Sequence, residues 1–233
     1  MFHKAIKSES KLRLAIYGHR IILADPPWHY NNRRATRRDN PSKKPKAGIG
    51  ASGKYRRGVM SFTDLCAMGP LVQAVAAPDA LLFCWVTCPR LDCGIGLYKA
   101  WGFQWATVAF VWEKLYPNGQ TFRGMGAYTP SNAEFLLVGR RANLWHPNTG
   151  WKPPQVVRTP HPRDPETRKL IHSRKPEIFQ DHLRDWLGPH IGDGGMLELF
   201  ATRQRIGWTC LGDELTGTDV RDDLAAMAAD RAA

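Results

Sequence analysis

Ile21-Ile22-Leu23-Ala24-Asp25-Pro26-Pro27-Trp28 is the stretch of sequence that decides the fold. Its four apolar residues predict a buried strand, because a short continuous apolar run is typical of a strand that is covered on both faces. The two prolines fix φ and remove two backbone donors, so the strand has to end before them. In an open α/β sheet, ligands bind beyond the carboxyl ends of the strands. Asp25 therefore stands where an active site is expected.

Short runs rich in Val, Ile and aromatic residues recur along the chain and predict further strands at 81–87, 107–112, 134–138, 155–158, 196–200 and 206–211. Helices are predicted between and after them, at 62–75, 90–101, 176–187 and 220–233. Ser61 and Asp64 form a capping signal for the first of these helices. Strands that alternate with helices predict an α/β fold with a largely parallel sheet.

The length and composition favour one domain that spans residues 1–233, with 43% hydrophobic residues to fill its core. No stretch approaches the roughly 18 uninterrupted apolar residues of a membrane span, and we expect a soluble, cytoplasmic protein. An odd number of cysteines fits free thiols better than a disulfide framework. Their spacing does not favour zinc, and we predict no metal site among Cys66, Cys84, Cys88, Cys93 and Cys210.

Positive charge is concentrated in two segments, although the whole chain has a net charge of +12. Residues 31–57 carry a net charge of +9 and residues 140–175 one of +7, so the remainder is mildly acidic. Lys and Arg release counterions when they neutralise phosphates, and both segments are predicted to be loops that bind a polyanion. The contacts predicted in the first loop are Arg33, Arg34, Arg37, Arg38, Lys43, Lys44, Lys46, Lys54, Arg56 and Arg57.

The turn that follows the first strand is rich in hydrogen-bond acceptors. Pro26 and Pro27 have no N–H, so the turn presents carbonyl oxygens and the Asp25 carboxylate. Such a surface suits an amine that donates two N–H bonds.

Several further blocks of sequence follow in a fixed order. They are Met60-Ser61, Leu82 to Thr87, Gly124 to Thr129 leading to Asn132-Ala133-Glu134, His172 to Glu177, and Glu198-Leu199-Phe200-Ala201 followed by Gly207-Trp208 and Gly212-Asp213-Glu214. With the Asp-Pro-Pro-Trp motif, they make residues 21–217 resemble the MT-A70 family of adenine methyltransferases. That family includes the catalytic subunit of the eukaryotic messenger-RNA adenosine methyltransferase and many bacterial and phage proteins.

The resemblance implies a Rossmann-like class I methyltransferase that uses S-adenosylmethionine, with a mostly parallel sheet of seven to eight strands. The catalytic motif would precede the cofactor-binding strand in sequence. The implied catalytic residues are Asp25, Pro26, Pro27 and Trp28. The implied cofactor-binding residues are Ser173 and Lys175 for the carboxylate, Glu198, Phe200 and Thr202 at the cofactor strand and its turn, and Asp213 and Glu214 for the ribose hydroxyls. Thr202 stands where the family commonly has Arg, for which Arg203 or Arg205 can substitute.

The motif suits the 6-amino group of adenine. Asp25 and the Pro26 carbonyl would each accept one N–H bond, which leaves the nitrogen lone pair free for the methyl group. Trp28 would stack on the base, an interaction worth roughly 1–3 kcal/mol. Positioning of this kind needs no metal. A base within a duplex has to be flipped out first.

Alternatives remain open on the substrate. DNA is favoured over RNA, because the chain looks like the compact bacterial and phage members. An RNA adenosine methyltransferase, a non-catalytic nucleic-acid-binding subunit of the same fold, and a protein glutamine methyltransferase are the other candidates. The resemblance implies that a homodimer would pair through loops beside the active site, here residues 113–128.

Overall fold

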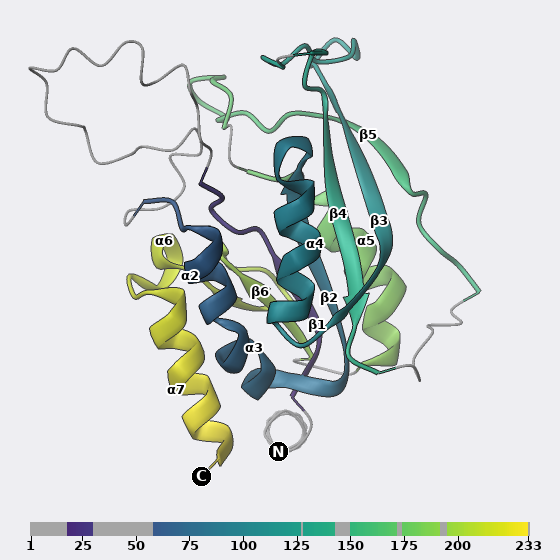
Figure 1. The fold of residues 1–233 in the computed structure, drawn as a ribbon. Coiled ribbons are helices and arrows are strands. Elements are labelled where there is room, and N and C mark those ends of the chain that lie inside the picture. The colour runs from purple at the N-terminus through teal and green to yellow at the C-terminus, as the bar shows by residue number, and fades with distance from the viewer. Residues whose placement is uncertain are drawn as a thin grey trace, which may run out of the picture.

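The computed structural model describes residues 18–29, 58–126, 128–142, 150–171, 174–191 and 195–232. Seven strands of this part of the chain form one sheet, in the order β5-β3-β4-β2-β1-β6-β7 (Figure 1). The strands are β1 (His19–Ala24), β2 (Ala76–Thr87), β3 (Gln104–Leu115), β4 (Ala133–Arg140), β5 (Val156–Pro160), β6 (Met196–Leu199) and β7 (Thr209–Leu211). The helices are α2 (Phe62–Ala67), α3 (Gly69–Val75), α4 (Leu91–Ala100), α5 (Ile178–Leu187), α6 (Asp213–Thr216) and α7 (Val220–Ala232). The described residues also contain two 3-10 turns, η1 (Cys88–Arg90) and η2 (Gly188–His190).

The sheet is mostly parallel. Strand β4 pairs antiparallel with both β2 and β3, while β1 pairs in parallel with β2 and β6, as do β6 with β7 and β3 with β5. The α/β fold predicted from the alternation of strands and helices is therefore confirmed. Because β4 alone is reversed, the end of β3 and the start of β4 lie at the same sheet edge as the end of β1.

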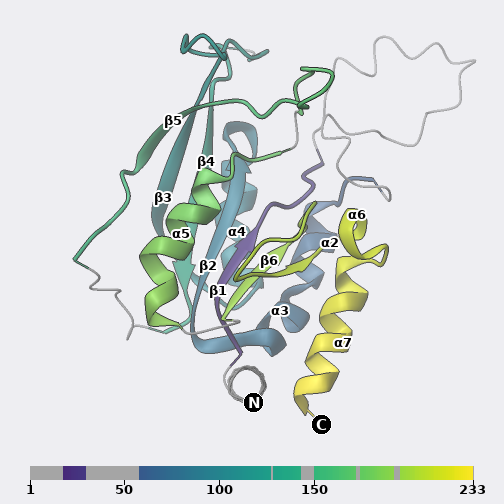
Figure 2. The same ribbon diagram turned by 180° about the vertical axis from the view of Figure 1, so that it is seen from behind.

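Helices cover both faces of the sheet, with α2, α3, α4 and α7 on one face and α5 on the other (Figures 1 and 2). Alternate residues of β1 point to opposite faces of the sheet, and so to the two layers of helices. Ile22 and Ala24 belong to the core under the first group of helices, and Ile21 and Leu23 to the core under α5. This burial on both faces explains why β1 is a continuous apolar run rather than an alternating one.

The prediction of one helix over residues 62–75 is wrong in one respect, because the segment is divided at Met68 into α2 and α3. Pro70 stands in the first turn of α3. A proline there has no N–H to bond to the preceding turn, so the helix restarts instead of continuing. The capping box of Ser61 and Asp64 is confirmed, since each side chain bonds to the other residue's backbone N–H.

All five cysteines are free thiols. Within the described ranges, no cluster of three or more His, Cys, Asp or Glu side chains could hold a metal ion. No helix in the same ranges is long and apolar enough to cross a membrane.

Candidate functional site

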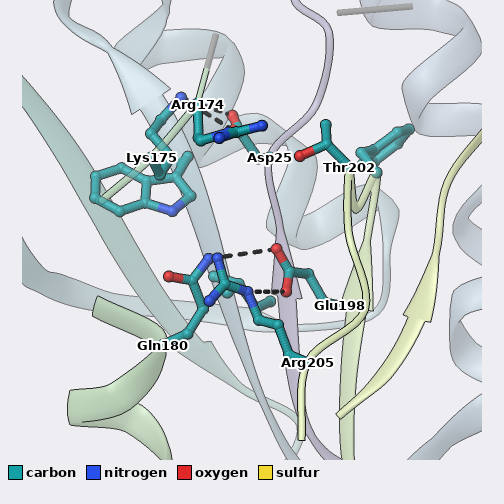
Figure 3. Close-up of a pocket in the computed structure, with 10 residues that line it drawn as sticks. Asp25, Arg174, Lys175, Gln180, Glu198, Thr202 and Arg205 are labelled. Atoms are coloured by element: carbon teal, nitrogen blue, oxygen red, sulfur yellow. Dashed lines mark hydrogen bonds and ion pairs between the residues drawn. The ribbon is translucent and has the colours of Figure 1, made fainter. Parts of the chain in front are cut away.

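A small hollow lies at the end of the sheet where β1 and β6 finish. It is lined by residues from the ends of three strands, from α5 and the segment before it, and from the turn after β6: Leu23, Asp25, Trp85, Arg174, Lys175, Gln180, Glu198, Phe200, Thr202 and Arg205. Arg174 and Lys175 lie beside Asp25, while Gln180 and Arg205 flank Glu198 (Figure 3). The hollow therefore has two charged groups of residues.

The carboxylates of the site come from β6, from β4 and from the residue after β1, and they share one face of the sheet. Asp25 follows Ile21 and Leu23, Glu198 follows Met196, and Glu134 precedes Leu136, each at a spacing of two residues. These apolar residues all belong to the core under α5. Because side chains alternate along a strand, all three carboxylates are directed to that same face.

The Asp-Pro-Pro-Trp turn is held by its own backbone and by the segment before α2. The Trp28 N–H donates to the Pro26 carbonyl at 2.9 Å, and the Met60 N–H donates to the Pro27 carbonyl at 2.9 Å. Trp28 is only 6% exposed, and its indole N–H donates to the Trp85 carbonyl at 3.0 Å. Trp28 thus packs into the core and fixes the turn.

Asp25, Lys175, Glu134 and Lys114 form a chain of four alternating charges. The Lys175 Nζ lies 3.0 Å from each carboxylate oxygen of Asp25 and 3.2 Å from Glu134 Oε2. The other oxygen, Glu134 Oε1, accepts from Lys114 Nζ at 2.6 Å. The four side chains are between 8% and 14% exposed. Charges so far from water are tolerated only when they are paired, as these are.

The protonation of the two central residues follows from these pairings. Burial alone raises the pKa of Glu134, but Lys175 and Lys114 outweigh it and lower that pKa to about 2. Burial likewise opposes the charge of Lys175, yet Asp25 and Glu134 raise the pKa of its ammonium above its ordinary value. Glu134 and Lys175 are therefore both charged at neutral pH.

The second charged group centres on Glu198. Arg205 Nε lies 3.2 Å from Glu198 Oε2, and the Gln180 side-chain amide lies 3.3 Å from Glu198 Oε1. Phe200 ends β6 by taking a φ of 64°, in the left-handed region that non-glycine residues rarely adopt. This turn brings Thr202 and Arg205 to the hollow.

Five of the residues expected at the site line the hollow: Asp25, Lys175, Glu198, Phe200 and Thr202. The others in the described ranges lie outside its lining: Pro26, Pro27, Trp28, Asp213 and Glu214. Asp213 is buried at the start of α6, and its Oδ2 has no hydrogen-bond partner within the described residues. Ser173 and the ten basic residues predicted to bind nucleic acid between Arg33 and Arg57 lie outside the described residues.

Sequence reasoning missed the roles of Glu134, Lys114 and Gln180. A signal for two of them was present, because Lys114 is in phase with the buried Phe110 and Trp112 of β3, and Glu134 with the buried Leu136 of β4. A charged residue on the buried face of a strand needs a partner and thereby points to a site.

Comparison with known proteins gives a consistent result. The model of the family MT-A70 matches residues 19–214. The chain is 28% identical to the type II methyltransferase M.MunI of a Mycoplasma species, over 84% of this chain and 78% of that protein. It is 24% identical to the human N(6)-adenine-specific methyltransferase METTL4, over 84% of this chain but only 37% of that protein.

Proposed function

The chain belongs to the MT-A70 family, and from that premise we propose that it transfers a methyl group from S-adenosylmethionine to the 6-amino group of adenine in a nucleic acid. The observation that carries the proposal is the position of Asp25, which directly follows β1 and lines a hollow shared with the cofactor residues expected in and after β6. We favour DNA over RNA as the polymer, with RNA as the alternative.

The residues of the hollow fit the cofactor. Arg174 and Lys175 offer cations to a carboxylate. Asp213 lies outside the lining of the hollow, but its buried Oδ2, which has no hydrogen-bond partner within the described residues, suits a ribose hydroxyl donor. Phe200 adds apolar surface to the lining. When bound, S-adenosylmethionine supplies a methyl group on a sulfonium, which a nitrogen lone pair can attack without a metal.

Asp25 and the Pro26 carbonyl act as acceptors for the amine. The Pro26 carbonyl already accepts the Trp28 N–H, but a carbonyl oxygen has a second lone pair. Lys175 contacts both oxygens of Asp25 and so fixes the direction of that carboxylate. Acceptors held in place before the amine arrives contribute to catalysis mainly by orientation.

We assign Trp28 a supporting role in place of the stacking on adenine that its position in the motif suggests. Its burial leaves little of the ring for stacking on a base. We propose that Trp28 supports the turn through its bond to the Trp85 carbonyl, and that it acts on the reaction by holding Asp25 and Pro26 in place.

The nucleic acid would be held by the basic segments at 31–57 and 140–175. Several cations of the second segment lie in the described part of the chain and are exposed or half-buried: Lys152, Arg158, Arg163, Arg168, Lys169 and Arg174. Phosphate contacts by such residues position the polymer without reading its sequence. An adenine in a duplex would then be flipped out of the stack to reach Asp25.

The test is transfer of a labelled methyl group to DNA and RNA oligonucleotides, each single- and double-stranded, followed by digestion to nucleosides. We expect the label on adenine and a higher rate on DNA. A higher rate on RNA would identify an RNA adenosine methyltransferase. Binding of nucleic acid without any transfer would contradict the enzyme and favour a non-catalytic subunit.

A further inference from the structure

Lys114 is a buried cation that does not line the hollow. It stands near the end of β3, and its side chain is 11% exposed. In the register of β3 and β4, Trp112 lies opposite Glu134, so Lys114 is the diagonal neighbour of Glu134. The Lys114 Nζ lies 5.1 Å from the centre of the Trp112 ring. The lysine is thus fixed by its own strand and by the adjacent one.

Glu134 divides its two oxygens between two lysines. Oε1 accepts from Lys114 at 2.6 Å, and Oε2 lies 3.2 Å from Lys175. Lys175 in turn lies closer to Asp25, at 3.0 Å from each oxygen. The shorter contact of Glu134 is therefore with the lysine that is remote from the hollow, and the shorter contacts of Lys175 are with the catalytic carboxylate.

We propose that Lys114 is a positioning residue for methyl transfer, which acts through Glu134 to keep Lys175 on Asp25. This inference rests on the proposed function. Lys114 satisfies one oxygen of Glu134 and counters its negative charge, which limits the attraction of Glu134 for Lys175. Lys175 then remains against both oxygens of Asp25 and holds that carboxylate in the direction that the amine requires.

The proposal can be distinguished from the alternative in which Lys114 only stabilises the pairing of β3 with β4. Without the Lys114 charge, Lys175 is the cation that still contacts the buried Glu134 among the described residues, and Glu134 draws it away from Asp25. If Glu134 is also made neutral, that attraction disappears and the loss of Lys114 has no further consequence for Asp25. A purely structural lysine would not show this dependence on Glu134.

The experiment compares Lys114→Met, Lys114→Arg, Glu134→Gln and the double variant Lys114→Met/Glu134→Gln. Lys99→Met is the matched control, since Lys99 is an exposed lysine of α4. We expect Lys114→Met to lower kcat about 10- to 100-fold, with the KM for nucleic acid changed less than about twofold. Lys114→Arg should keep most of the kcat, and the double variant should match Glu134→Gln. If Lys114→Met does not fold, Lys114→Gln replaces it with the same expectation.

A second measurement uses the ligand-free protein and does not depend on methyl transfer. In carboxyl carbon-13 NMR, the Asp25 resonance should move in Lys114→Met and change no further when Lys114→Met is added to Glu134→Gln. A wild-type protein that transfers no methyl group would refute the proposed function, and the NMR result would then decide the role of Lys114. An unmoved Asp25 resonance, or a separate loss of kcat from Lys114→Met in the Glu134→Gln background, would overturn the inference.

Discussion

Lys175 places its ammonium 3.0 Å from both carboxylate oxygens of Asp25, although 150 residues separate the two in sequence. The contact joins the turn after β1 to the segment before α5, and both residues line the same hollow. The resemblance to the MT-A70 family implied that Lys175 binds the cofactor carboxylate. The structure adds a contact with Asp25, the proposed catalytic carboxylate, so that one lysine connects the proposed cofactor and amine sites.

Replacing Lys175 by Met should destabilise the protein. The change leaves Asp25 and Glu134 buried with too little positive charge, and breaking a buried ion pair typically costs about 3–5 kcal/mol. Urea unfolding measures this loss in the free energy of unfolding. The matched control is Lys169→Met, which removes an exposed lysine and should change stability by less than about 0.5 kcal/mol. Equal stability of Lys175→Met and wild type would refute the pairing.

The stability of the protein should depend on Glu134 at acid pH. Lys175 and Lys114 overcome the effect of burial and lower the pKa of Glu134 from 4.5 to about 2. A lowered pKa gives stability that is present above the unfolded value and is lost as the pH falls from about 4.5 to about 2. The loss should be on the order of 3 kcal/mol. Unfolding of wild type and Glu134→Gln at several pH values measures it, and equal slopes for the two proteins would contradict the expectation.

Asp213→Asn should weaken cofactor binding without weakening the fold. The buried Oδ2 of Asp213 has no partner in the described residues, so its charge costs stability unless a ligand donates to it. We expect the affinity for S-adenosylmethionine to fall by about 1.5–3 kcal/mol, the contribution of a hydrogen bond to a charged group. Calorimetry measures the affinity and thermal unfolding the stability. Glu214→Gln tests the exposed neighbour, and a larger effect there would assign the ribose contact to Glu214.

Neutralising Lys43, Lys44 and Lys46 together should weaken nucleic-acid binding and reduce its salt dependence. Each phosphate contact contributes about 0.9 to the slope of log K against log salt for duplex DNA, so three contacts contribute about 2.7. Binding titrations at several salt concentrations measure the slope. An unchanged slope would place the nucleic acid against another surface of the protein.

The strands were predictable from the sequence because the local pattern and the tertiary structure agree. The apolar run Ile21 to Ala24 lies within β1, and the runs at 81–87 and 134–138 lie within β2 and β4. The order of the strands was not predictable, since β4 lies between β2 and β3 and local patterns do not specify which strands pair. The break between α2 and α3 is marked in the sequence by Pro70.

Part of the site was also predictable. Asp25 and Glu198 stand at the carboxyl ends of parallel strands, where residues far apart in sequence meet. The pairing of Glu134 with Lys114 and Lys175 depends on the strand order and on the segment before α5, which no local pattern specifies. The left-handed Phe200 was unpredictable as well, because a phenylalanine rarely takes that conformation without tertiary contacts.

The most direct test of the proposed reaction is the mass and chromatographic retention, against standards, of the nucleosides released from an adenine-containing oligonucleotide after incubation with S-adenosylmethionine, for wild type and Asp25→Ala. The wild type should yield adenine methylated at the 6-amino group. Asp25→Ala should bind the cofactor but transfer at least about 100-fold more slowly, because the amine has lost its main acceptor. Methylation of another base, or an undiminished rate in Asp25→Ala, would contradict the central claim.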